Sequence, residues 1–118
     1  MKILIIDDES LDLFINRKLL SLEFEVEGFT SFEEGQSWIE TNDFNVVLID
    51  YYLGPGLFAH DVLQKIIALK GSNAFKAFVL SNYVDENQTR NLKEAGFIDV
   101  ILKPLTTDSF KSKMENLT

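Results

Sequence analysis

Five strand-like segments, each followed by a stretch with helical spacing, limit most strongly what this chain can fold into. The expected strands cover residues 2–6, 25–29, 44–49, 74–80 and 97–102. Most are continuous apolar runs, which are typical of strands buried on both faces, whereas residues 25–29 alternate in polarity like a strand near a sheet edge. Regular alternation with helices and right-handed crossovers predicts a doubly wound parallel α/β sheet with helices on both faces.

The intervening stretches predict helices that begin and end at recognisable signals. Ser10 is placed to cap the first helix, whose apolar residues recur at about 3.6 positions per turn: Leu11, Phe14, Ile15, Leu19 and Leu22. Ser31 with Glu34 resembles a capping box that opens a helix to residue 41. Further helices are expected over residues 58–69, over 85–95 with Gly96 as the terminator, and over 107–115.

Length and composition indicate one domain over residues 1–118. Hydrophobic residues make up 46% of the chain, which is enough to fill a core, and the absence of cysteine excludes disulfides and thiolate sites. A net charge of −8 disfavours direct binding to nucleic acid. Because no apolar run approaches the roughly 20 residues that cross a bilayer, we expect a cytoplasmic protein without a membrane segment.

Polar residues end four of the five expected strands: Asp7 with Asp8, then Asp50, Ser81 and Lys103. The carboxyl ends of parallel strands meet at one edge, where α/β sheets bind ligands. Three carboxylates at such an edge would repel each other by about 4 kcal/mol per pair at close range, so they require a cation. Oxygen ligands without histidine or cysteine select a hard ion, and a shallow site suits Mg²⁺.

The same cluster has the parts needed for phosphoryl transfer. An ion held by Asp8 and Asp50 would leave one Asp50 oxygen free to attack phosphorus. The metal and the Lys103 ammonium would then share the charge of the phosphoryl oxygens, and the Ser81 hydroxyl could donate a hydrogen bond to them.

The ordered motifs resemble those of the response regulator receiver domain, including the single-domain chemotaxis regulators. They are Ile-Ile-Asp7-Asp8-Glu9, Val-Leu-Ile-Asp50, Val-Leu-Ser81 and Leu-Lys103-Pro104. The resemblance implies a flavodoxin-like (βα)5 fold with strand order 2-1-3-4-5. It also implies a phosphorelay switch that is not an enzyme in the usual sense, since it catalyses only its own phosphotransfer and dephosphorylation.

The resemblance assigns a role to each matching residue. Asp50 is the implied phosphoacceptor, with Mg²⁺ bound by Asp8 and Asp50 directly, by Asp7 through water and by the backbone carbonyl of Tyr52. Ser81 is similar to the hydroxyl that moves toward the phosphoryl group, and Lys103 to the lysine that binds it. The Lys103–Pro104 peptide is expected to be cis.

Several positions depart from the family pattern. Asn82 replaces the usual small residue, and Tyr52 and Tyr83 flank the expected path of attacking water, so we expect a slowly hydrolysing aspartyl phosphate. Val100 occupies the position of an aromatic residue that usually rotates with the switch.

The resemblance also implies partners. A histidine kinase or phosphotransfer protein would supply the phosphoryl group, usually at the first helix. The output side would be the face of residues 85–115, including Arg90, Asn91, Val100 and Lys111, which would contact a downstream protein or output domain. The chain would be a monomer or a phosphorylation-dependent dimer.

Two alternatives remain open from the residues alone. A small haloacid-dehalogenase-type phosphohydrolase would use Asp7 as nucleophile with Ser81, Asn82 and Lys103, but it would leave Asp50 without a role. A phosphorylation-independent interaction module of the same fold would have no need for the complete set of acids, hydroxyl and lysine.

Overall fold

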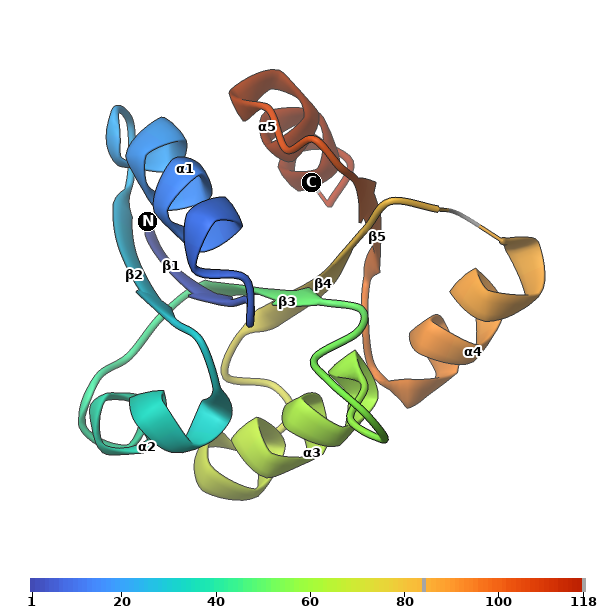
Figure 1. The fold of residues 1–118 in the computed structure, drawn as a ribbon, viewed down its shortest axis with the longest axis horizontal. Coiled ribbons are helices and arrows are strands. Elements are labelled where there is room, and N and C mark those ends of the chain that lie inside the picture. Colours follow the sequence, from blue (N-terminus) through green and yellow to red (C-terminus); the bar gives the residue numbers. More distant parts are fainter. Residues whose placement is uncertain (84, 118) are drawn as a thin grey trace.

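The computed structural model describes residues 1–83 and 85–117, in which strands and helices alternate along the chain (Figure 1). The strands form one parallel sheet in the order β2-β1-β3-β4-β5. Their bounds are β1 Lys2–Ile6, β2 Glu25–Phe29, β3 Val46–Asp50, β4 Lys76–Ser81 and β5 Asp99–Leu102. The predicted fold class and strand order are therefore confirmed, with strand ends displaced by one or two residues.

Helices cover both faces of the sheet, and each face has its own core. The helices are α1 Ser10–Ser21, α2 Phe32–Thr41, α3 Ala59–Lys70, α4 Glu86–Ala95 and α5 Thr107–Glu115. α1 and α5 lie on one face, with Leu20 and Phe110 in its core, whereas α2, α3 and α4 lie on the other (Figure 1). None of the described helices is long and apolar enough to cross a membrane.

The apolar stripe predicted for α1 is largely on the wrong face. Leu11, Phe14 and Ile15 are 69%, 58% and 52% exposed. The buried residues are instead Leu13, Asn16 and Leu20. Both sets satisfy helical spacing, so periodicity could not choose between them. Leu13 packs closely against β2: a Cβ on Gly28 would lie 2.6 Å from Leu13 Cδ1, so a larger residue at position 28 would force the leucine side chain to move.

Of the two serines predicted to cap helices, one does so and the other does not. Ser10 does not cap α1: it is the first helical residue, and Glu9 precedes the helix without a side-chain cap. The Asp7 carboxylate organises this turn instead, because Asp7 Oδ1 accepts a hydrogen bond from the Glu9 N–H at 3.0 Å. Ser31 does cap α2 by accepting from the Glu34 N–H at 3.1 Å.

Parallel register aligns the ends of the central strands. Asp50 pairs with Leu80 across β3 and β4, and Ser81 pairs with Leu102 across β4 and β5. The Lys103 N–H then donates to the Ser81 carbonyl at 2.8 Å. The sheet therefore places Asp50, Ser81 and Lys103 on neighbouring strand ends at one edge.

Two leucines of α1 test the observed orientation of this helix. Leu20 is fully buried and Leu22, just after α1, is 82% exposed. Leu20→Ala is expected to reduce the free energy of unfolding by about 2–5 kcal/mol through lost burial and a cavity. The matched variant Leu22→Ala should change it by less than about 0.5 kcal/mol. Urea denaturation measures both, and equal losses would contradict this orientation.

Candidate functional site

Three carboxylates converge at the carboxyl edge of the sheet. Asp7, Asp8 and Asp50 each offer an oxygen within 4.8 Å of the others. Asp7 follows β1 directly and is fully buried, Asp50 ends β3 and is 9% exposed, and Asp8 faces solvent. The turn held by Asp7 directs Asp8 outward and brings the start of α1 beside the cluster.

The Lys103 ammonium lies among these carboxylates. Its Nζ is 2.6 Å from Asp50 Oδ1, a charge-assisted hydrogen bond, and 3.8 Å from Asp7 Oδ2. The lysine side chain is only 12% exposed. The Lys103–Pro104 peptide is cis. One ammonium therefore compensates carboxylates from two strand ends.

Burial and charge both act on the acidity of this cluster. Burial is the main cause that raises the pKa of Asp7 to about 6; the nearby Asp50 carboxylate acts in the same direction, whereas the Glu9 N–H and Lys103 oppose the shift. Burial also raises the pKa of Asp50, although Lys103 opposes the shift. Burial by itself would lower the pKa of Lys103, but Asp50 and Asp7 reverse that effect and raise it above its ordinary value. Lys103 therefore stays protonated, but its single positive charge does not neutralise all three carboxylates of the cluster.

An orphaned oxygen indicates that a cation fits beside the carboxylates. Asp7 Oδ2 is buried and has no hydrogen-bond partner among the described residues, which is costly for a charged oxygen. Its distance to Lys103 Nζ is too long for a hydrogen bond. A hard cation with its water shell would supply the missing partners, and the oxygen-only donor set suits Mg²⁺.

The Ser81 hydroxyl is turned toward the loop that follows β4. Its Oγ donates to the Tyr83 carbonyl at 2.8 Å and accepts from the Tyr83 N–H at 3.2 Å. Ser81 also lines the hollow above Asp50, which has a volume of about 330 Å³. Asn82, Tyr83 and Tyr52 line the same hollow, so all three residues expected to modify the site are at its rim.

Comparison with known proteins identifies the family of this chain. A family model described as the response regulator receiver domain matches residues 3–115. The chain belongs to the response regulator receiver domain family. No curated protein matches it.

Solved receiver domains share its fold. A response regulator receiver domain protein from Clostridium thermocellum is 28% identical, with a TM-score of 0.80, and the alignment covers 98% of this chain and 91% of that one. A CheY-like receiver domain protein from Methanospirillum hungatei JF-1 is 26% identical, with a TM-score of 0.79 and the same coverage of both chains. A response regulator from Thermotoga maritima, 21% identical with a TM-score of 0.79, covers 98% of this chain and 95% of its own, and shows the fold alone.

Two further acids, Glu9 and Asp12, line the hollow of this receiver domain, and sequence reasoning missed Asp12. Asp12 lies in the first turn of α1, and its Oδ2 is 3.7 Å from Lys103 Nζ. Acids in a first turn are common because they favour the helix dipole, so the residue type alone carried no signal. The available signal was its spacing, because the first turn of the helix after β1 has to face the strand ends.

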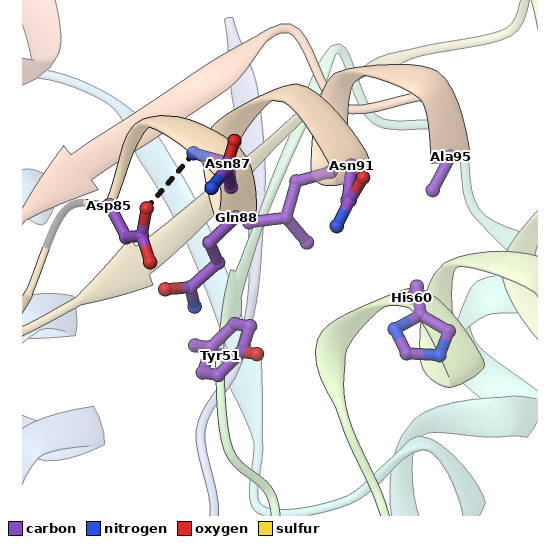
Figure 2. A pocket seen from close by; sticks show the side chains of 8 residues that line it. Tyr51, His60, Asp85, Asn87, Gln88, Asn91 and Ala95 are labelled. Atoms are coloured by element: carbon purple, nitrogen blue, oxygen red, sulfur yellow. Dashed lines mark hydrogen bonds between the residues drawn. The ribbon is translucent and has the colours of Figure 1, made fainter.

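A second hollow separates α3 from α4 (Figure 2). The α4 side chains Gln88 and Asn91 point toward it, and Tyr51 and His60 lie across from them (Figure 2). Leu92 is the only α4 residue that is buried among those described. The helix therefore turns a polar surface toward the body of the domain.

One of the residues expected on the output face, Val100, is buried. Asn91 is exposed and also lines the hollow toward α3. Val100 is 6% exposed and packs in the core with Leu92 and Phe97. An inward β5 position buries a small aliphatic side chain, so Val100 contributes no surface for a partner.

The raised pKa of Asp7 predicts how pH affects stability without metal. A folded pKa of about 6 against an unfolded value of 3.8 means that ionised Asp7 destabilises the fold once the pH exceeds both values. Asp7→Asn should therefore raise the unfolding free energy above about pH 6 by about 1–3 kcal/mol, and this gain should shrink toward zero near about pH 4.

Thermal unfolding in a chelating buffer measures this effect. The control Asp43→Asn removes an exposed acid at the opposite end of the sheet and should show no such pH-dependent gain. An Asp7→Asn protein that is less stable than the wild type above about pH 6 would contradict the assignment.

Proposed function

We propose that this receiver domain is a phosphoacceptor switch of a two-component phosphorelay, with Asp50 as the acceptor. The observation that carries the proposal is the hydrogen bond between Lys103 Nζ and Asp50 Oδ1 inside the carboxylate cluster. It leaves Asp50 Oδ2 available to a donor, and Asp50 lines an open hollow that a phosphoryl group can enter.

The proposed step transfers one phosphoryl group. An Asp50 oxygen attacks phosphorus, the bond from phosphorus to the donor breaks, and the leaving group keeps that electron pair. Lys103 lies close enough to Asp50 to bind the oxygens of the new phosphoryl group and to neutralise part of their charge. Mg²⁺ held by Asp8, Asp50 and the Tyr52 carbonyl, with Asp7 contacting its water, would neutralise the remaining charge.

Ser81 is proposed to report the modification to the following loop. Its hydroxyl now uses both its donor and its acceptor on the Tyr83 backbone. Donating to a phosphoryl oxygen would take the hydroxyl hydrogen away from the Tyr83 carbonyl. The loop before α4 would lose a hydrogen bond in exchange, which supports a conformational change in that loop on phosphorylation.

Movement of α4 is the proposed output. Because Val100 has no aromatic ring and is buried, we infer that the signal passes through α4 and its preceding loop and not through rotation of a ring. The single buried residue Leu92 and the hollow facing α3 support this route, because little apolar contact opposes a shift of the helix.

The exposed apolar surface of α1 is the proposed docking face for a histidine kinase or phosphotransfer protein. Besides the residues it buries in the core, this helix exposes the apolar side chains of Leu11, Phe14 and Ile15, and Ile15 lines the groove next to Asp12 and Lys103. An apolar patch of this kind on a receiver domain supports helix-on-helix contact with a donor.

Labelling with acetyl phosphate and Mg²⁺ tests the acceptor. We expect one phosphoryl group per chain, mapped to Asp50 by peptide mass spectrometry, and complete loss of label in Asp50→Asn because no carboxylate remains to attack. Asp43→Asn, the remote control, should be labelled like the wild type. Label on Asp7 would favour the phosphohydrolase instead. Absence of label, together with no change in amide resonances near Ser81 and Lys103 on adding beryllofluoride, would favour a phosphorylation-independent module.

The rim tyrosines predict a long-lived phosphoryl group. Tyr52 and Tyr83 are 50% and 67% exposed and line the hollow through which water reaches Asp50. Replacing both in Tyr52→Asn/Tyr83→Ala is expected to shorten the half-life of the aspartyl phosphate several-fold by opening that path. Loss of label is followed over time after the donor is removed. An unchanged half-life would show that the rings do not limit access.

A further inference from the structure

Asp12 lies between the phosphoacceptor hollow and a neighbouring groove. It lines the hollow above Asp50, and it also lines the groove between α1 and residues Lys103 and Leu105. Its side chain is 40% exposed, so the carboxylate is at the mouth of the site and not within the core. A small phosphodonor that approaches Asp50 from this side therefore passes close to the Asp12 charge.

The contact of Asp12 with Lys103 acts through charge. Lys103 directs its short hydrogen bond to Asp50, whereas Asp12 Oδ2 is 3.7 Å from the ammonium, beyond hydrogen-bond distance. Among the described residues of α1, only Asp12 forms an ion pair with Lys103. Asp12 therefore attracts the same Lys103 ammonium that an incoming phosphoryl group needs to neutralise its charge.

Counting formal charges shows why this acid matters. One divalent cation and the Lys103 ammonium would together balance the carboxylates of Asp7, Asp8 and Asp50. Glu9 and Asp12, which line the same hollow, add negative charges that this arrangement does not balance, and of these two it is Asp12 that forms an ion pair with Lys103. Helix-dipole stabilisation explains an acid in the first turn of α1, but it does not require that acid to contact the phosphate-binding lysine.

We propose that Asp12 is a specificity-determining residue that makes this site discriminate against small dianionic phosphodonors. Repulsion grows with the charge of the donor, so a dianion is disfavoured more than a donor with a single negative charge. A protein donor that carries a cationic side chain beside its phosphohistidine would instead pair with Asp12 and release Lys103 toward the phosphoryl group. The chemistry remains attack by Asp50 on phosphorus with departure of the leaving group.

The inference rests on the proposed phosphoacceptor function and is tested with two small donors. Rates of labelling by dianionic acetyl phosphate and by phosphoramidate, which has a single negative charge, are measured with Mg²⁺ on the full chain. Asp12→Asn should raise the ratio of the acetyl phosphate rate to the phosphoramidate rate by roughly three- to tenfold at low salt, and added salt should diminish this gain.

Two variants separate local charge from other effects. Asp12→Glu keeps the charge near Lys103 and should preserve the wild-type ratio. Glu94→Gln makes the same change in net charge on α4, away from the site, and should also leave the ratio unchanged. In the wild type itself, added salt should speed acetyl phosphate labelling more than phosphoramidate labelling, a measurement that does not depend on the folding of any variant.

The outcomes distinguish this inference from the function on which it rests. A wild-type protein that neither donor labels would overturn the phosphoacceptor assignment. A wild-type protein that both donors label, with the same donor ratio in Asp12→Asn, would overturn only the role of Asp12. An equal change of ratio in Glu94→Gln would also overturn it, because overall charge would then be the cause.

Discussion

The arrangement of the site depends on the pairing of one buried ammonium with several carboxylates. Lys103 is the only basic residue that lines the hollow above Asp50 among the residues described, and it contacts Asp50, Asp7 and Asp12. Removing one partner of such a set leaves charges without compensation, which costs more than the pair contributes in water. The strand register is the structural means of keeping them together, since it fixes the backbone of Lys103 against Ser81.

This charge imbalance links binding chemistry to stability. Burial and neighbouring carboxylates together raise the pKa of Asp7, and its buried Oδ2 has no hydrogen-bond partner among the described residues, so ionised Asp7 needs a cation beside it. Any cation that enters relieves that cost, so part of the binding free energy comes from removing repulsion already present in the fold. The same imbalance explains why an additional acid at the mouth, Asp12, influences which donors can approach.

Much of the fold could be predicted from the sequence because its signals are redundant. Apolar runs, strand-end polar residues and helix terminators all agreed and together predicted the parallel sheet, whereas its strand order came from the resemblance to the receiver family. The orientation of α1 could not be predicted, because Leu13 with Leu20 and Phe14 with Ile15 both satisfy helical periodicity. That choice depends on the close approach of Leu13 to Gly28, a contact between segments distant in sequence.

The parts of the site that sequence did not reveal depend on side-chain direction. The predicted acids, hydroxyl and lysine do meet at one edge, but the present partner of Ser81, the Tyr83 backbone, follows from a loop conformation that no motif encodes. Burial of Val100 likewise depends on how α4 and β5 pack. Residue identity could locate the site, whereas tertiary contacts determine the direction in which each group points.

One helix, α1, carries both the proposed docking surface and the charge that would select the donor. Leu11, Phe14 and Ile15 are exposed on the same helix whose first turn places Asp12 beside Lys103. Apolar contact contributes affinity whatever the charge of the donor, whereas Asp12 distinguishes donors by charge and is sensitive to salt. Because the two effects arise from different side chains, substitutions on α1 can change recognition of a protein donor without changing discrimination among small ones.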